Sequence, residues 1–471
     1  MSQHQQPSHD EGGEVTEVVC QESDLKDGQM KEVAVGGQKV LLVRTQGQYS
    51  AVGSQCSHYN APLIKGALVG DRVRCPFHGA CFNVRTGDIE EYPGLDCLPS
   101  YKVQTPSLDW FPVSHLGLTK RVREMCSVAP GAKHTVLLIG GGPASLLCAE
   151  TLRQNCYEGQ IIMVTKDTLP PFDKPKLSKA MNLDSGSIVL RSTDFYQQHG
   201  IEVWLQKEVV SVNPAGKEVK LSDGTSQHYD QLLISTGCRA RPLSCPGADL
   251  TGVKLLQGYE DEKNVTFHMN ESVTEIRGEN GKVKEVVLRS GTILEADVVI
   301  AGIGVIPNSD FLAGSGVEVD SKKAVIVDKF LKTNVADVFS AGDVTAFPLT
   351  VRGDQRVNIG HWQMSQAQGK VAALNMLKKP TKIDSVPFFW TVLLGKSIRY
   401  TGYGEGHTEI IFKGKVEERK FLAFYIKDDV VVAAASLMFD PAVARLAELM
   451  ATGQTITKAQ AQAEDLSWLQ M

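Results

Sequence analysis

Residues 134–154, HTVLLIGGGPASLLCAETLRQ, indicate the architecture of the middle of this chain. Its apolar start, residues 134–139, predicts a buried strand, and residues 146–154 predict a helix. The glycines between them permit a tight turn and let backbone N–H groups approach a pyrophosphate at the helix N-terminus, although such a turn also occurs without a ligand. A second apolar run at residues 161–164 completes a strand–helix–strand unit of an α/β domain.

Length and composition place the chain among soluble globular proteins of several domains. It has 471 residues, of which 42% are hydrophobic and 22% are charged. Its 49 basic and 54 acidic residues give a net charge of −5, so no general basic field would gather nucleic acid. No run of about 18 uninterrupted apolar residues occurs, and we expect no membrane span. Residues 1–14 are polar and lack the apolar core of a secretory signal, so we expect a flexible tail and a cytoplasmic location.

Changes in pattern along the chain predict an all-β domain, an α/β Rossmann-like domain and an α+β C-terminal domain. Apolar runs at residues 232–235 and 338–340 and a helical pattern at residues 362–377 continue the second domain. In the third, strand-like runs precede a helix at residues 441–450. The expected boundaries are 15–116 for the all-β domain, 133–250 and 301–380 for the α/β domain, 251–300 for a segment inserted into it, and 385–471 for the C-terminal domain.

Two short loops of the all-β domain each offer one cysteine and one histidine. Cys56-Ser57-His58 is followed, after sixteen residues, by Cys75-Pro76-Phe77-His78. Thiolate sulfur suits iron, and neutral imidazole removes negative charge from a metal centre and raises its potential. Zinc is the alternative metal, although zinc fingers usually pair Cys with Cys and His with His along the chain.

This region resembles a Rieske [2Fe–2S] domain. The resemblance implies a cysteine pair on one iron, Cys56 and Cys75, and a histidine pair on the other, His58 and His78. Respiratory Rieske proteins carry hydroxyl donors where this chain has Ala80 and Phe82. Because hydrogen bonds to the cluster sulfurs stabilise the reduced state, their loss implies a low-potential cluster of the ferredoxin type.

Later motifs support a flavin as the ligand of the glycine turn. Residues 333–343, TNVADVFSAGD, resemble the second flavin motif of pyridine-nucleotide:disulfide-type reductases, in which the final aspartate bonds the ribityl chain of FAD. Residues 232–237 resemble their connecting strand and turn, residues 174–179 the helix that places a lysine beside the flavin, and residues 361–363 the segment against the isoalloxazine. The implied FAD contacts are Gly140, Gly142, Ser145, Asp167, Lys174, Lys179, Thr236, Gly237, Gly342, Asp343, His361 and Trp362, of which Lys179 and Trp362 would tune the ring.

The order of these regions resembles the apoptosis-inducing factor 3 family from about residue 15 onward. Members carry a second, inserted dinucleotide fold for NAD(P)H. Here Gly237 and Gly302 are only 65 positions apart, whereas such a fold needs roughly twice that length. The interval has no G-x-G-x-x-G and resembles only the trailing β-meander and last strand of the insert. We therefore expect NAD(P)H to lack a competent site, and the shortened insert to expose apolar strand edges.

Together these features predict an FAD-dependent oxidoreductase that exchanges electrons between its flavin and its cluster, with a terminal electron acceptor of unknown identity. The alternative is a redox-inactive isoform that acts as a binding or cell-death signalling protein. The family resemblance also implies a mitochondrial association. Phe388, Phe389 and Trp390 we interpret as core or domain-interface packing.

Overall fold

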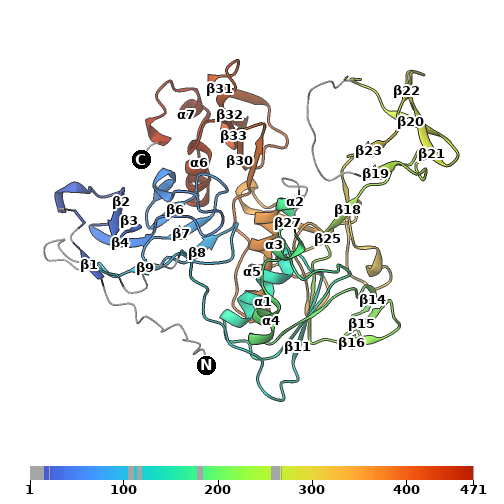
Figure 1. Ribbon diagram of the computed structural model, residues 1–471, viewed down its shortest axis with the longest axis horizontal. Helices are drawn as coiled ribbons and strands as arrows, with labels where there is room; N and C mark the ends of the chain where they lie inside the picture. Colours follow the sequence, from blue (N-terminus) through green and yellow to red (C-terminus); the bar gives the residue numbers. More distant parts are fainter. Residues whose placement is uncertain are drawn as a thin grey trace, which may run out of the picture.

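The computed structural model shows an all-β domain, an α/β domain and a C-terminal domain packed together (Figure 1). It describes residues 15–17, 19–20, 22–103, 111–113, 119–177, 184–255, 266 and 268–469. The expected tail, residues 1–14, and the expected flavin residue Lys179 lie outside these ranges.

Two four-stranded antiparallel sheets form the N-terminal domain, with strand orders β2-β3-β4-β9 and β5-β6-β7-β8, and β1 pairs separately with β10. Leu41, Val52, Leu63 and Phe82 belong to the buried core between them. The bounds are β1 Val15–Glu17, η1 Glu22–Asp24, β2 Gln29–Val35, β3 Gln38–Thr45, β4 Gln48–Gly53, η2 Leu63–Lys65, β5 Ala67–Val69, β6 Arg72–Arg74, β7 Cys81–Asn83, β8 Ile89–Glu91, β9 Ser100–Tyr101 and β10 Phe111–Val113.

A five-stranded parallel sheet, in the order β13-β12-β11-β17-β26, is the centre of the α/β domain. Its apolar runs are buried on both faces, as is usual for parallel strands. Val136 and Leu138 pack with helices α1 and α5, whereas Leu137 and Ile139 pack with strands β14 and β15. The bounds are β11 Thr135–Ile139, α1 Pro143–Gln154, β12 Gln160–Val164, α2 Lys174–Leu177, α3 Ser185–Ile188, α4 Thr193–Gln198, β13 Ile201–Trp204, β14 Val209–Asn213, β15 Glu218–Leu221, β16 Ser226–His228, β17 Gln231–Ile234, η3 Asp310–Leu312, β25 Val325–Ile326, β26 Val338–Ser340, β27 Thr345–Leu349, η4 Thr350–Arg352, β28 Gln355–Asn358 and α5 Trp362–Met376.

The segment inserted into this domain consists of small sheets that extend away from the body of the molecule (yellow in Figure 1). Strands β20, β21 and β22 form an antiparallel meander, and β19 pairs in parallel with β23. Between residues 237 and 302, the described residues contain no helix. The bounds are β18 Cys238–Ala240, β19 Val253–Leu255, β20 Val273–Glu279, β21 Lys282–Leu288, β22 Ile293–Glu295, β23 Val299–Ala301 and β24 Val305–Pro307, which pairs with β18.

The C-terminal domain is a five-stranded antiparallel sheet, in the order β29-β30-β33-β32-β31, packed against helix α6. Helix α6 also touches strands β5 and β6 of the N-terminal domain. The bounds are β29 Phe388–Leu393, β30 Lys396–Gly402, β31 Glu409–Lys415, β32 Lys420–Lys427, β33 Val430–Leu437, α6 Ala442–Ala451, α7 Lys458–Gln462 and η5 Ser467–Leu469. Among the helices that the structure describes, none combines the length and apolar character needed to cross a membrane.

Candidate functional site

The two Cys/His loops of the N-terminal domain share one backbone conformation. In the first, Cys56 N–H donates to Ala61 O and Asn60 N–H donates to Cys56 O. In the second, Cys75 N–H donates to Ala80 O and Gly79 N–H donates to Cys75 O, the same pattern of spacing. Asn60 and Gly79 take the left-handed conformation at equivalent positions, with φ of 53° and 80°, and Asn and Gly tolerate it best.

These matched loops bring the four predicted ligands together. The His58 and His78 ring centroids lie 5.0 Å apart, and the Cys56 and Cys75 thiols share a hydrogen bond. The Nδ1 atoms of both histidines are buried without a hydrogen-bond partner. Because a buried polar atom needs a partner, a bound metal would supply the partner that these two nitrogens lack.

Burial also sets the protonation state that a metal needs. Desolvation lowers the pKa of His58 to about 4, and desolvation, together with the charges of His58 and Arg399, lowers that of His78 to about 3. Both imidazoles are therefore neutral near pH 7, which is the form that binds metal. The hydrogen bond shared by the thiols raises the pKa of Cys56 and lowers that of Cys75.

The pairing of the predicted ligands bears on the kind of metal site. A structural zinc site gathers four ligands around one point. One cysteine pair and one histidine pair instead suit two irons, each with two protein ligands.

A cavity of about 1090 Å³ lies at the carboxyl end of the central sheet and reaches the second ligand loop. Most of the predicted FAD residues line it: Gly140, Gly142, Asp167, Lys174, Thr236, Gly237, Gly342, Asp343, His361 and Trp362. Its volume and its glycine-lined end fit an extended dinucleotide. Ser145, by contrast, is fully buried in helix α1 and does not line the cavity. Its hydroxyl lies 2.6 Å from Ser235 Oγ and joins the helix to the sheet.

The turn after strand β11 brings backbone to the cavity wall. Gly140 has a φ of 125°, and a Cβ atom there would lie 2.2 Å from Ser235 O. Only glycine is accommodated at this position, because both the conformation and the contact exclude a side chain. Gly142 follows as the N-cap of helix α1, with open space at its Cβ position. The N-terminus of α1 therefore faces the cavity, as a pyrophosphate site requires.

Asp343, which also lines the cavity, is held by the neighbouring helix α5. Gly342 N–H donates to Gln368 Oε1 at 2.7 Å, and Ser365 Oγ donates to Asp343 Oδ1 at 2.9 Å. Burial raises the pKa of Asp343, whereas the Ser365 hydroxyl and the charge of Lys174 lower it. The carboxylate thus keeps an acceptor oxygen beside the cavity for a ligand hydroxyl.

Two aromatic residues that the sequence analysis did not assign to the site connect the cavity with the Cys/His loops. The Trp390 ring lies 5.2 Å from His78 and 4.8 Å from His361, and it lines the cavity. Tyr59 also lines it, with a ring 4.1 Å from that of His58. Its hydroxyl donates to Asp173 Oδ2 of the α/β domain at 2.6 Å. The motif order placed these residues in separate domains, so only the folded chain brings them together.

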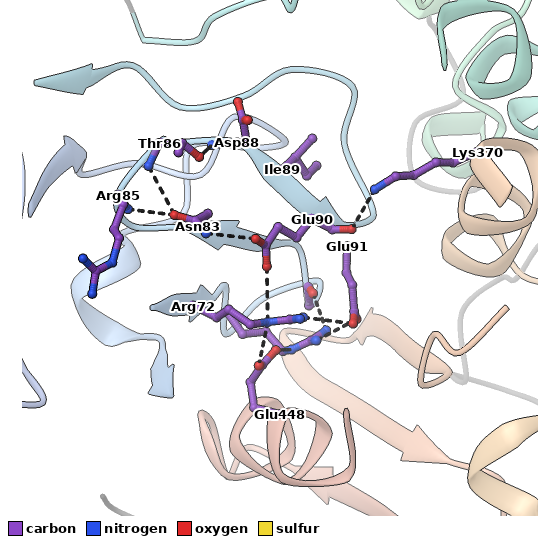
Figure 2. A network of polar contacts seen from close by, with 12 residues as sticks. Arg72, Asn83, Arg85, Thr86, Asp88, Ile89, Glu90, Glu91, Lys370 and Glu448 are labelled. Carbon is purple, nitrogen blue, oxygen red and sulfur yellow. Dashed lines mark hydrogen bonds and ion pairs between the residues drawn. The ribbon is translucent and has the colours of Figure 1, made fainter. Parts of the chain in front are cut away.

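A buried charge network fixes the N-terminal domain on the C-terminal one. Figure 2 shows Glu448 pointing from helix α6 toward Arg72 and Glu91. Arg74 pairs with both Glu448 and Glu91, and Arg74 and Glu448 are fully buried. On the α/β side, Lys370 Nζ donates to the backbone carbonyl of Glu90 at 3.4 Å. The Cys/His loops are therefore held in one position relative to the cavity.

Comparison with known families agrees with this architecture. Residues 16–102 match the Rieske [2Fe-2S] domain, residues 134–263 and 253–369 match pyridine nucleotide-disulphide oxidoreductases, and residues 388–468 match the reductase C-terminal domain. The ferredoxin reductase for the CYP199A2 system from Rhodopseudomonas palustris shares the fold, with a TM-score of 0.65 and 24% identity over 72% of this chain and 99% of that one. The covalent putidaredoxin reductase–putidaredoxin complex gives a TM-score of 0.66 at 23% identity over 72% and 98%.

Fold and site together define an FAD-dependent electron-transfer oxidoreductase with a Rieske [2Fe–2S] domain, which confirms the predicted fold class and both predicted cofactors. Apoptosis-inducing factor 3 from Homo sapiens is 38% identical over 97% of this chain and 88% of its own length, as is the protein from Mus musculus. The chain belongs to the apoptosis-inducing factor 3 family. The human alignment spans 533 positions, whereas 97% of 471 residues is about 457, so about 76 positions of the relative have no counterpart here.

Proposed function

We propose that this chain moves electrons between its own FAD and its own Rieske cluster. The observation that carries the proposal is the shared cavity, which both His78 and the glycine turn at residues 140–142 line. Trp390 touches both sides of this junction, through His78 and His361. Packed side chains, and not a second protein, would thus join the two redox sites.

We assign the cluster to Cys56, His58, Cys75 and His78. The FAD we assign to Gly140, Gly142, Asp167, Lys174, Thr236, Gly237, Gly342, Asp343, His361 and Trp362, with Lys179 as a further contact and Trp362 tuning the ring. A bound flavin takes two electrons and releases them singly, which matches a one-electron cluster.

The side chains around the junction orient the cofactors and hold the loops. Burial lowers the pKa of His361 to about 4, so its imidazole stays neutral and adds no charge beside the flavin site. Its ring packs 4.1 Å from that of Phe389, which restricts its orientation. The Tyr59–Asp173 hydrogen bond ties the first ligand loop to the rim of the cavity.

We further propose that NAD(P)H is not the electron donor. A nicotinamide dinucleotide needs a strand, a glycine turn and the N-terminus of a helix. In the described part of the interval from residue 237 to residue 302, only short strands occur. The oxidoreductase family matches this chain in two stretches, residues 134–263 and 253–369, and their overlap at residues 253–263 lies in the same interval. Residues 251–300 are accordingly the remnant of the second dinucleotide domain.

The test is an anaerobic experiment on the full chain loaded with both cofactors. Photoreduction of the flavin should produce the EPR signal of the reduced cluster, and Trp390→Leu should slow its appearance while the yield stays the same. A reduced flavin without cluster reduction would contradict electron exchange and favour a binding protein. In a parallel stopped-flow run, micromolar NADH should leave the flavin absorbance unchanged; rapid bleaching would refute the second proposal.

A further inference from the structure

A buried cation from the C-terminal domain lies against the second ligand loop. Arg399 of strand β30 is 3% exposed, and its Nε–H donates to Pro76 O at 3.2 Å. Pro76 stands between the predicted ligands Cys75 and His78. The guanidinium also donates from Nη1 to Ile398 O at 2.9 Å, which holds the group in place.

The charge of Arg399 is only weakly compensated. Its one ion-pair partner among the described residues is Asp440, whose Oδ1 lies 3.9 Å away on a side chain that is 26% exposed. Arg74, by comparison, is bonded to two carboxylates that are themselves buried or nearly so. Arg399 therefore presents a largely unneutralised positive charge to the Cys75–His78 loop, in surroundings that screen it poorly.

We propose that Arg399, which belongs to the C-terminal domain, is a positioning residue that raises the reduction potential of the Rieske cluster in the N-terminal domain. One-electron reduction adds a negative charge to the bound cluster, so a fixed cation beside the loop favours the reduced state. Ala80 and Phe82 carry no hydroxyl to stabilise that state. The inference rests on the proposed ligand set, and it makes the potential depend on docking of the C-terminal domain.

The test is a mediated redox titration of the loaded full chain with dithionite, followed by the reduced-cluster EPR signal. Arg399→Gln should lower the equilibrium constant for cluster reduction at least tenfold, which is about 59 mV for one electron. Arg399→Lys keeps the charge and should stay within threefold of the parent. The matched control is Arg445→Gln, since Arg445 is also buried and donates to a carbonyl of the N-terminal domain, Leu68 O, outside the ligand loops. It should not shift the potential.

A second variant acts in the opposite direction and leaves the buried cation in place. Asp440→Asn removes the charge that partly offsets Arg399, so the potential should rise. An unchanged potential in Arg399→Gln, or an equal fall in Arg445→Gln, overturns the proposal. If Arg399→Gln does not retain its cluster, the potential of Asp440→Asn is the remaining test. An unchanged or lower potential in Asp440→Asn overturns the proposal. The titration does not use the flavin as reductant, so failure of internal electron exchange is a separate result.

Discussion

Cys56 and Cys75 are fully buried and each belongs to one of the two matched loops, so a change at either residue tests the proposed metal site directly. Cys75→Ser should lose iron, sulfide and the Rieske EPR signal, because a serine hydroxyl is not the thiolate ligand that iron needs. Flavin absorbance should remain. Cys20→Ser, at a buried cysteine of the same domain outside the loops, should keep the cluster, and a retained cluster in Cys75→Ser would refute the ligand assignment.

The pH dependence of stability should report the buried His361. Its pKa is lowered by burial to about 4, whereas the unfolded chain protonates it near its ordinary value of 6.5. Between these values the unfolded state binds more protons, so stability falls as the pH drops from 6.5 to 4, by at most about 3 kcal/mol from this group. Above pH 6.5 the group contributes nothing.

Urea unfolding of the parent and of His361→Gln at pH 7.5 and 4.5 measures this contribution. The substitution should reduce the loss of stability on acidification, whereas His228→Gln, at an exposed site, is the matched control. An identical acid-induced loss in the parent and in His361→Gln would show that burial of this imidazole is unimportant.

Sequence patterns predicted which residues would gather at the two sites better than they predicted the neighbours of those residues. The Cys/His spacing and the glycine turn are local, and the structure places those residues around two adjoining sites. Trp390 was interpreted as packing because nothing near it in the sequence indicates His78, which is more than 300 positions away. Ser145 was assigned to the ligand because the fingerprint pattern does not say which side of the helix it faces.

Helix α6 and strand β6 show how single elements set the position of a domain. Glu448 and Arg74 form a fully buried pair, and removing the Glu448 charge leaves Glu91 as the remaining carboxylate partner of Arg74. Glu448→Gln should therefore lower the free energy of unfolding by about 2 kcal/mol and slow electron transfer from flavin to cluster. Glu418→Gln breaks an exposed pair with Lys415 and should cost less than about 1 kcal/mol. Chemical denaturation measures the free energy of unfolding of both variants. An equal loss in Glu448→Gln and Glu418→Gln would mean that the network does not hold the domains together.

Periodicity predicted individual elements well and their assembly poorly. The helix expected at residues 362–377 is α5, Trp362–Met376, because its pattern is continuous. Helix α1 begins at Pro143 and not at residue 146, because proline is favourable in the first turn, where no N–H is needed. The docking of α6 on the N-terminal domain depends on residues 374 positions apart, a distance at which no local pattern operates.

In the whole molecule the three domains pack together, and the segment with strands β19 to β23 extends away from them (Figure 1). A sheet of few strands leaves strand edges unpaired, and β19 and β23 form a sheet of only two strands within the described residues. The fold class could be read from sequence because each domain has its own pattern.

The surface of the segment with strands β19 to β23 predicts self-association of the chain. Val298 and Ile300 beside and within β23 are 56% and 51% exposed, and apolar groups on an open strand favour pairing between copies. Val298→Lys with Ile300→Lys should keep the chain monodisperse at concentrations where the parent forms larger species, as measured by light scattering, with the flavin and cluster spectra unchanged. Val416→Lys, at an exposed apolar residue of the C-terminal domain, should leave the association as it is. If Val416→Lys were equally effective, general surface charge and not the open strand would control the association.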